Sequence, residues 1–192
     1  MFLVWLWLFH VVSFWINPGN QEVWIVKSNS SLIVHGSTNI NEFTCSVLSY
    51  GKTDTLVYYL DHFKQNKYKV NSKLHIPVGH FDCQNRFMTK DLQKTLKYDK
   101  FPFIVIDIKF LSSLPKGQGT YIEGQVDITI AGVKKLYTIP FYTSQKQNMT
   151  HMKGKKQVHF SDFHLIPPSK LGGSIRVNDL LDVEVNLVMT KN

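Results

Sequence analysis

The sequence contains very little arginine, although it is basic overall. Its 192 residues include 22 lysines and arginines against 14 aspartates and glutamates, a net charge of +8, yet Arg86 and Arg176 are the only arginines. Proteins that read nucleic acids depend on the planar guanidinium group, so nucleic acid is not an expected partner. Lysines scattered along polar strand faces indicate a solvated surface, with transient contact to an anionic membrane surface as a second interpretation.

The sequence also lacks the signatures of the common enzyme classes. It has no nucleophile elbow, no zinc-protease HExxH, no Walker motif and no dinucleotide-binding glycine pattern. We therefore predict neither enzymatic activity nor a cofactor. Met149, His151 and Met152 lie close together, as ligands of soft metals do. The lysine-rich segment around them holds no cysteine or carboxylate, so no metal site is predicted.

Charge is absent from the beginning of the chain. Residues 2–16, FLVWLWLFHVVSFWI, form an apolar run that is short for a membrane span but suits the core of a signal peptide. No Lys or Arg precedes the run, and no small-residue cleavage site follows it. We interpret residues 1–20 as a signal peptide, which predicts export to the periplasm or the extracellular space. A retained anchor and an incorrectly assigned start are the alternatives.

Only two cysteines are present, Cys45 and Cys83. An exported chain meets oxidising conditions, and each cysteine follows a phenylalanine, Phe43 or Phe81, near the end of a predicted strand. Neighbouring strands can bring two such sulfur atoms within bonding distance, so we predict a disulfide. The alternative is a pair of buried free thiols.

The middle of the chain changes from one hydrophobic period to another. Apolar residues first alternate with polar ones, as in a strand with one buried face. They then fall four residues apart, as in an amphipathic helix that Asn85 or Thr89 would cap. Pro102 forces the preceding residue out of the helical region, and alternation resumes. The predicted elements here are a strand at 74–78, a short helix near 88–97 and a strand at 104–110.

Strand patterns recur through most of the remaining chain. They cover residues 32–40, bent at Gly36, and residues 56–60, 122–130, 136–142, 158–165 and 181–189. Polar or Pro/Gly-rich stretches at 61–67, 112–119 and 143–156 are predicted as turns and loops. About eight strands without a repeat or linker predict one all-β domain over residues 21–192, either an antiparallel barrel or a sandwich. The length of the strands favours the barrel, because closure removes exposed edges.

The chain contains four segments in this order: SLIVHGSTNINEFTC, IPVGHFDCQNRFMTKDLQKTLKYDKFP, GQVDITIAGVKK and VHFSDFHLIPPSKLGGSIRVNDLLDVEVNLV. Together, and in the order found there, they resemble the YceI-like family of exported polyisoprenoid-binding barrels. Gln84 and His164 stand where the family usually has glycine, which affects local turns. The resemblance implies an eight-stranded antiparallel barrel of lipocalin-like form, with a helix near one end and an apolar interior.

One face of each long strand would point into this barrel. The predicted interior, ligand-binding side chains are Leu74, Ile76, Val78, Ile104, Ile106, Ile108, Ile122, Val126, Ile128, Ile130, Leu181, Val183, Val185 and Leu187. Periodicity does not decide between an open and a packed interior, since small eight-stranded barrels occur in both forms. The resemblance favours a cavity, and hence an exported barrel that sequesters or carries a polyisoprenoid or similar long-chain lipid. Two alternatives are a solid barrel whose Lys-rich loops bind an acidic protein, and an enzyme acting on a lipid head group at the barrel mouth.

Overall fold

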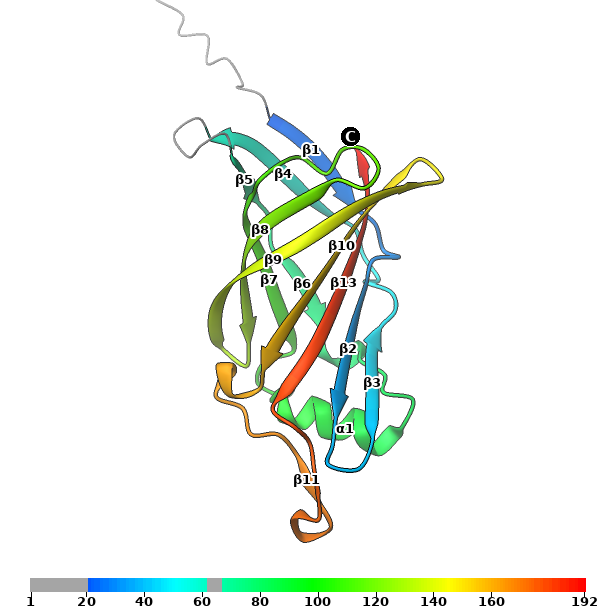
Figure 1. The fold of residues 1–192 in the computed structure, drawn as a ribbon, viewed down its shortest axis with the longest axis vertical. Coiled ribbons are helices and arrows are strands. Elements are labelled where there is room, and N and C mark those ends of the chain that lie inside the picture. Colours follow the sequence, from blue (N-terminus) through cyan, green and yellow to red (C-terminus); the bar gives the residue numbers. More distant parts are fainter. Residues whose placement is uncertain (1–20, 62–66) are drawn as a thin grey trace, which may run out of the picture.

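The computed structural model describes residues 21–61 and 67–192, and Figure 1 shows the arrangement of its elements. The predicted signal peptide at residues 1–20 lies outside the described residues. The strands are β1 (Gln21–Val26), β2 (Ser31–Ser37), β3 (Glu42–Val47), β4 (Asp54–Asp61), β5 (Lys67–Asn71), β6 (Leu74–Pro77), β7 (Phe103–Leu111), β8 (Tyr121–Ile130), β9 (Val133–Lys146), β10 (Met149–His159), β11 (Ser169–Lys170), β12 (Ile175–Arg176) and β13 (Leu180–Lys191). The helices are α1 (Arg86–Thr95) and the short 3₁₀ turns η1 (Val78–His80), η2 (Ser161–Phe163) and η3 (Leu171–Gly173).

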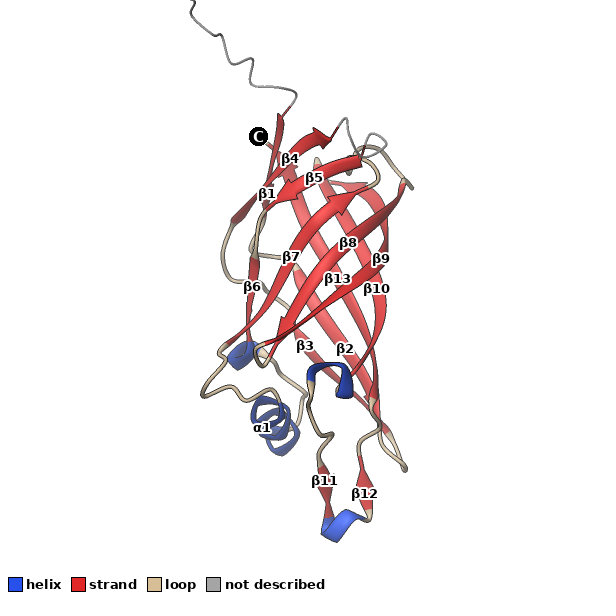
Figure 2. Cartoon of the chain, turned by 90° about the vertical axis from the view of Figure 1, so that its left-hand side faces the viewer, coloured by secondary structure: helices blue, strands red, loops and turns tan. Residues whose placement is uncertain are grey.

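Eight strands close into an antiparallel barrel. The ring runs β1-β4-β5-β7-β8-β9-β10-β13, and β13 pairs with β1 to complete it. Figure 2 shows the long tilted strands of this barrel, with α1 and the β11–β12 hairpin at the end opposite the C-terminus. The prediction of an all-β, eight-stranded antiparallel barrel with one short helix is confirmed.

The half of the barrel that faces α1 is completed by β2, β3 and β6. Strand β13 pairs with β1 near its end and with β2 over residues 182–186. Where it changes partner, the backbone of Val188 stays satisfied: its carbonyl accepts from the Lys27 amide at 2.8 Å, and its amide donates to the hydroxyl of Ser30 at 3.0 Å. Because Ser30 itself is buried, this hydroxyl replaces a ladder hydrogen bond that water could not supply.

The predicted disulfide joins Cys45 to Cys83. It joins β3 to the segment between η1 and α1, and no strand pair connects β3 to β6 within the described chain. A single bridge between Ser46 and Asp82, with hydrogen bonds of 2.8 and 2.9 Å, accompanies the disulfide. The covalent bond therefore holds together a part of the wall that backbone hydrogen bonds hardly connect.

Helix α1 lies across this end of the barrel (Figure 1). It begins after Asn85, one of the two predicted caps, whose side-chain oxygen accepts from the amides of Phe87 and Met88 at 3.0 and 3.1 Å. Leu92 and Leu96 are buried against the core, as the four-residue period predicts.

Several predicted boundaries are wrong. The polar stretch 143–156 is no loop: β9 and β10 form a long hairpin through it, turning at Gln147 and Asn148, both with positive φ. The predicted strand at 158–165 is also wrong, because β10 ends at His159 and η2 follows. Polar or small inward-facing residues in the hairpin conceal the alternation on which the prediction relied.

Two further corrections concern single residues. Strand β2 ends at Ser37, short of the predicted residue 40, and Gly36 is required by a close approach: a Cβ there would lie 2.3 Å from the Phe43 ring. In β7 the pairing skips one residue between Ile108 and Phe110. This bulge turns Leu111 into the core, so Phe110 does not continue the predicted inward face.

Candidate functional site

The two ends of the barrel interior differ. Near the C-terminus the interior is filled by fully buried side chains, among them Tyr58, Leu111, Met152 and Met189. Toward α1 it contains a cavity of about 90 Å³. Its wall is lined almost wholly by hydrocarbon and carries no carboxylate, and its ionisable lining residues are Lys156 and His159. Such a wall suits an apolar molecule rather than a charged substrate.

The cavity includes most of the predicted interior residues. Those on its wall are Leu74, Ile104, Ile106, Ile108, Val126, Ile128, Ile130, Leu181, Val183, Val185 and Leu187. Ile76 lines a separate small void, while Val78 and Ile122 are buried without lining the cavity. Val78 begins η1, where the strand alternation has ended, and Ile122 lies in the packed part of the barrel. Whether any of these side chains binds a ligand stays a prediction.

The sequence did not predict about half of the residues that line the cavity. The additional lining residues are Leu32, Val34, Phe81, Leu92, Leu96, Ile139, Phe141, Gly154, Lys156, Val158, His159, Phe160, Phe163 and Leu165. Four of them could have been found: the alternation in β2 indicates Leu32 and Val34, and the apolar stripe of the predicted helix indicates Leu92 and Leu96. The residues around η2 have no periodic signal, because this segment is neither strand nor long helix.

Phe141 of β9 marks the border between the packed end and the cavity. Its ring lies over two glycines of the neighbouring strands: a Cβ on Gly124 would be 2.6 Å from the ring, and a Cβ on Gly154 would be 2.5 Å from it. Both glycines are at inward positions, so their missing side chains let the ring lie flat against the wall.

Beside the cavity, the barrel wall has a seam without backbone pairing. Strands β9 and β10 pair from Met149 only as far as Gly154, opposite Phe141. Beyond that point β9 pairs with β8 and β10 pairs with β13, so the last residues of β10 have no partner on the β9 side. We call this gap between residues 133–140 and 155–159 the β9–β10 seam.

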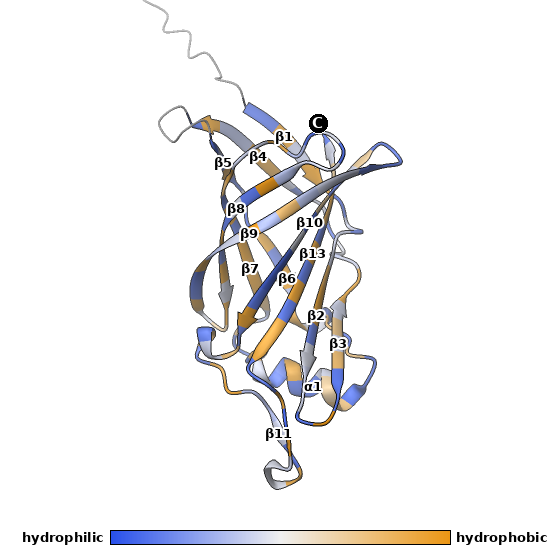
Figure 3. Cartoon of the chain, in the orientation of Figure 1, coloured by the Kyte–Doolittle hydropathy of each residue, from blue (hydrophilic) through white to orange (hydrophobic). Residues whose placement is uncertain are grey.

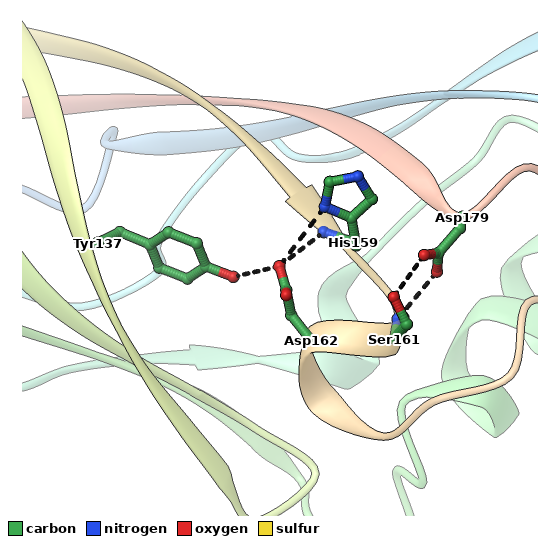
Figure 4. Close-up of polar contacts among 5 residues, drawn as sticks. All are labelled: Tyr137, His159, Ser161, Asp162 and Asp179. Atoms are coloured by element: carbon green, nitrogen blue, oxygen red, sulfur yellow. Dashed lines mark hydrogen bonds and ion pairs between the residues drawn. The ribbon is translucent and has the colours of Figure 1, made fainter.

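Side chains close the seam (Figure 4). The hydroxyl of Tyr137 on β9 donates to Asp162 of η2 at 2.8 Å, and the same carboxylate accepts from the backbone amide of His159 at 3.2 Å. Ser161 is held to Asp179 through its amide, at 2.9 Å, and its hydroxyl. The turn η2 is thereby fixed over the seam from both sides.

The electrostatics of the seam follow from these contacts. The hydrogen bond from Tyr137 is the main cause that lowers the pKa of Asp162, with smaller contributions from the His159 amide and from nearby positive charge. Desolvation, followed by the hydrogen bond to Asp162, raises the pKa of the Tyr137 hydroxyl. The Nζ atom of Lys156 lies 5.6 Å from the centroid of the Tyr137 ring. The seam therefore joins a neutral phenol, an ionised carboxylate and an ammonium group.

A second hollow, of about 250 Å³, lies outside the first and shares Val34, Leu92, Phe160 and Leu181 with it. It is bordered by α1, by the β2–β3 turn and by residues of the β11–β12 hairpin. We call this hollow the vestibule. Because the two share four lining residues, the vestibule adjoins the cavity at the α1 end.

The part of the chain that the structure describes contains no group of three His, Cys, Asp or Glu residues placed to hold a metal ion. In the segment that carries Met149, His151 and Met152, the His151 ring forms a hydrogen bond with Asn186 at 3.3 Å, and Met152 is fully buried. Within residues 21–61 and 67–192, no helix has the length and hydropathy needed to span a membrane.

The fold and cavity define a class of protein: a closed eight-stranded antiparallel barrel with an apolar interior hollow at the end that a helix covers. Comparison with solved structures gives matches in this class. A polyisoprenoid-binding domain from Saccharophagus degradans superposes with a TM-score of 0.62 at 8% identity, over 88% of this chain and 98% of that one. BcnA of Burkholderia cenocepacia superposes with a TM-score of 0.55 at 15% identity, over 88% and 95%.

A YceI protein of Campylobacter jejuni also matches, with a TM-score of 0.49 at 17% identity, over 71% of this chain and 80% of that one. No family model matches the sequence, and comparison with curated proteins gives no match. The superpositions on the polyisoprenoid-binding domain and on BcnA confirm the YceI-like fold that the four segments predict.

Proposed function

We propose that this protein is an exported, non-enzymatic barrel that binds one apolar chain, a long isoprenoid or a similar lipid, with the chain inside and its head toward the vestibule. The observation that carries the proposal is the apolar cavity at the α1 end, which shares lining residues with a hollow open to the outside. The resemblance of the four segments and the superposition on a polyisoprenoid-binding domain support the choice of lipid.

The volume of the cavity sets a condition on this function. A cavity of about 90 Å³ is smaller than the roughly 150 Å³ that holds a single benzene in an engineered protein core. A long chain therefore enters only if side chains or whole segments move. We expect the covering elements to move. Leu92 of α1, its C-cap residue Leu96 and Phe163 of η2 line the wall without belonging to the barrel ladder.

The energetics suit a carrier that releases its load. Burial of hydrocarbon is worth about 0.8 kcal/mol per methylene group relative to water. A membrane lipid, however, is already buried in the bilayer, so transfer into the barrel gains little on this account. The net affinity then depends on the fit to the cavity and on contacts of the head group, which permits release.

The experiment is extraction of the purified protein with organic solvent and identification of co-purified lipid by mass spectrometry. Ile128→Trp fills the cavity without adding a charge and should remove the lipid while leaving a folded barrel by circular dichroism. Leu136→Trp is the matched control, because Leu136 is exposed on β9 and should keep the lipid. An unchanged lipid yield from folded Ile128→Trp protein would contradict the proposed site.

The small cavity also favours one alternative, a solid barrel whose Lys-rich loops bind an acidic protein. Wild-type protein that never carries lipid, from its own cells or after incubation with vesicles, would support this alternative.

The disulfide between Cys45 and Cys83 supports export, since such bonds persist in oxidising compartments. Alkylation of free thiols in freshly lysed cells, before and after reduction, would test export: protein found reduced would speak against it.

A further inference from the structure

Exposed apolar side chains gather around the vestibule. Ile40 in the β2–β3 turn, Phe87 in the first turn of α1, Ile166 after η2 and Leu171 at the tip of the β11–β12 hairpin are 66, 78, 87 and 76% exposed. They are four of the five most exposed large hydrophobic residues in the described chain, the fifth being Leu48. We call these four residues the vestibule rim. Scattered single exposed residues are ordinary, but a set at one opening marks an interaction surface.

Three of the four segments that carry the rim are fixed to one another. The side chain of Asn39 donates to the carbonyl of Ser174 at 2.9 Å and accepts from the amide of Arg176 at 2.9 Å, which ties the β2–β3 turn to the hairpin. Lys170 of the hairpin forms an ion pair with Asp91 of α1 at 2.7 Å. Ile40 and Phe87 both line the vestibule. Ile166 and Leu171 lie next to or near the lining residues Pro168 and Lys170 in sequence, so the rim brings apolar tips together at the vestibule.

The β11–β12 hairpin forms the extreme end of the molecule, and the other rim segments lie behind it at the same end. Figure 2 shows the β11–β12 hairpin projecting past α1 along the long axis, and Figure 3 shows hydrophobic residues in both elements. The chain's C-terminus lies at the opposite end (Figure 1). A flat surface that approached this end would meet the hairpin first, and then α1 and the β2–β3 turn, before it met the barrel wall.

The charge around the rim is positive. Residues 38–41, 86–95 and 166–177 hold five cations and a single carboxylate, which is already paired with Lys170. Of the other cations, Arg86, Lys90, Lys94 and Arg176 have no carboxylate within 4 Å among the described residues. Cations beside apolar tips are the combination by which peripheral proteins hold an anionic membrane surface.

We propose that the vestibule rim docks on the surface of a lipid bilayer containing anionic lipids, with its apolar side chains at the level of the headgroups and the vestibule facing the membrane. A second copy of the chain fits less well. A stable dimer buries about 800 Å² of continuous, complementary surface per partner, whereas the rim residues stand on separate projections around a hollow. This docking does not depend on the identity of the cargo, or on there being one.

The test is sedimentation of lipid-free protein with vesicles of phosphatidylcholine alone or with phosphatidylglycerol added. Wild-type protein should bind the anionic vesicles, and high salt should weaken the binding because it screens the cations. Phe87→Ser and Leu171→Ser should each weaken binding about tenfold, since each removes one large apolar side chain from the contact. Leu48→Ser is the matched control, because Leu48 is 72% exposed outside the rim, and it should bind as wild type does.

Circular dichroism of each variant confirms that the barrel is folded. The proposal would be overturned by wild-type protein that does not bind anionic vesicles, or by rim variants and the Leu48 variant that bind equally well. Wild-type protein that dimerises in solution, with rim variants that are monomeric, would show instead that the rim joins two copies. Vesicle binding by protein that never co-purifies with lipid would leave the docking intact and count against the proposed cargo alone.

Discussion

Replacing tyrosine with phenylalanine should change the stability of this barrel in opposite directions at two positions, Tyr137 and Tyr58. Tyr137→Phe removes the hydrogen bond to Asp162, which then keeps only the amide of His159 at 3.2 Å and the imidazole of His159 at 3.6 Å. A hydrogen bond to a charged group is worth about 1.5–3 kcal/mol. The Asp162 side chain is 35% exposed, so solvent screening reduces the expected loss to about 1 kcal/mol.

Tyr58→Phe is the matched comparison. The Tyr58 hydroxyl is fully buried and has no hydrogen-bond partner among the described residues. Burial, with a smaller effect of Glu22, raises its pKa. Because water satisfies this hydroxyl in the unfolded chain and nothing replaces that water on folding, Tyr58→Phe should stabilise the protein by about 1 kcal/mol.

The pH dependence separates the Tyr137 effect from general loss of packing. The folded state lowers the pKa of Asp162 below its ordinary 3.8. A lowered carboxyl pKa contributes stability above the unfolded value and loses that contribution as the pH falls through the folded value. The difference between wild type and Tyr137→Phe should therefore be constant from about pH 5 to 8 and shrink below about pH 4.

Urea unfolding of the three proteins across this pH range provides the measurement. For a chain of this length, 1 kcal/mol corresponds to a change in Tm of about 2–4 °C, which calorimetry resolves. Equal effects of the two substitutions, or a loss in Tyr137→Phe that persists at pH 3, would refute the assignment of the seam hydrogen bond.

Three further substitutions probe the elements around the cavity. Replacing both Cys45 and Cys83 with alanine opens a loop with a sequence separation of 38 and should lower stability by about 4 kcal/mol in urea unfolding; unchanged stability would contradict a bridged wild type. Gly154→Ala places a Cβ 2.5 Å from the Phe141 ring and should lower stability by about 1–3 kcal/mol, a loss that Phe141→Leu in the same protein should partly reverse. Asn85→Ala removes the cap of α1 and should lower stability by about 1 kcal/mol, whereas Asn85→Ser should retain most of it.

The strands that the sequence predicts best are those whose inward face is uniformly apolar. Strands β8 and β13 alternate strictly, and the structure places them within one or two residues of the predicted bounds. The β9–β10 hairpin could not be recognised in this way, because its inward positions include Thr143, Thr150 and Gly154. Thr143 and Thr150 are buried at the packed end and bonded to neighbouring groups, so their polarity is compatible with the core.

The site was predictable only where it coincides with strand periodicity. The bulge in β7 is a shift in backbone pairing that changes which side chain faces inward. No residue type in this strand indicates the bulge. The vestibule depends on three segments far apart in the sequence, joined through Asn39 and Lys170. The cavity volume depends on packing, which periodicity does not specify.

In the half of the barrel that faces α1, the wall lacks a hydrogen-bonded ladder at two places. These two places are not equivalent. Between β3 and the segment that follows η1, the disulfide replaces the ladder, and a covalent bond does not open under native conditions. Along the β9–β10 seam, the Tyr137–Asp162 hydrogen bond and the packing of η2 replace it, and both can be broken at the expense of a few kcal/mol. A chain longer than the present cavity needs the wall to give way near η2 and α1. The seam is therefore where the barrel should widen. On lipid binding, we expect faster hydrogen exchange at the His159 amide, which donates to Asp162, and no matching increase at the amides of Ser46 and Asp82 beside the disulfide.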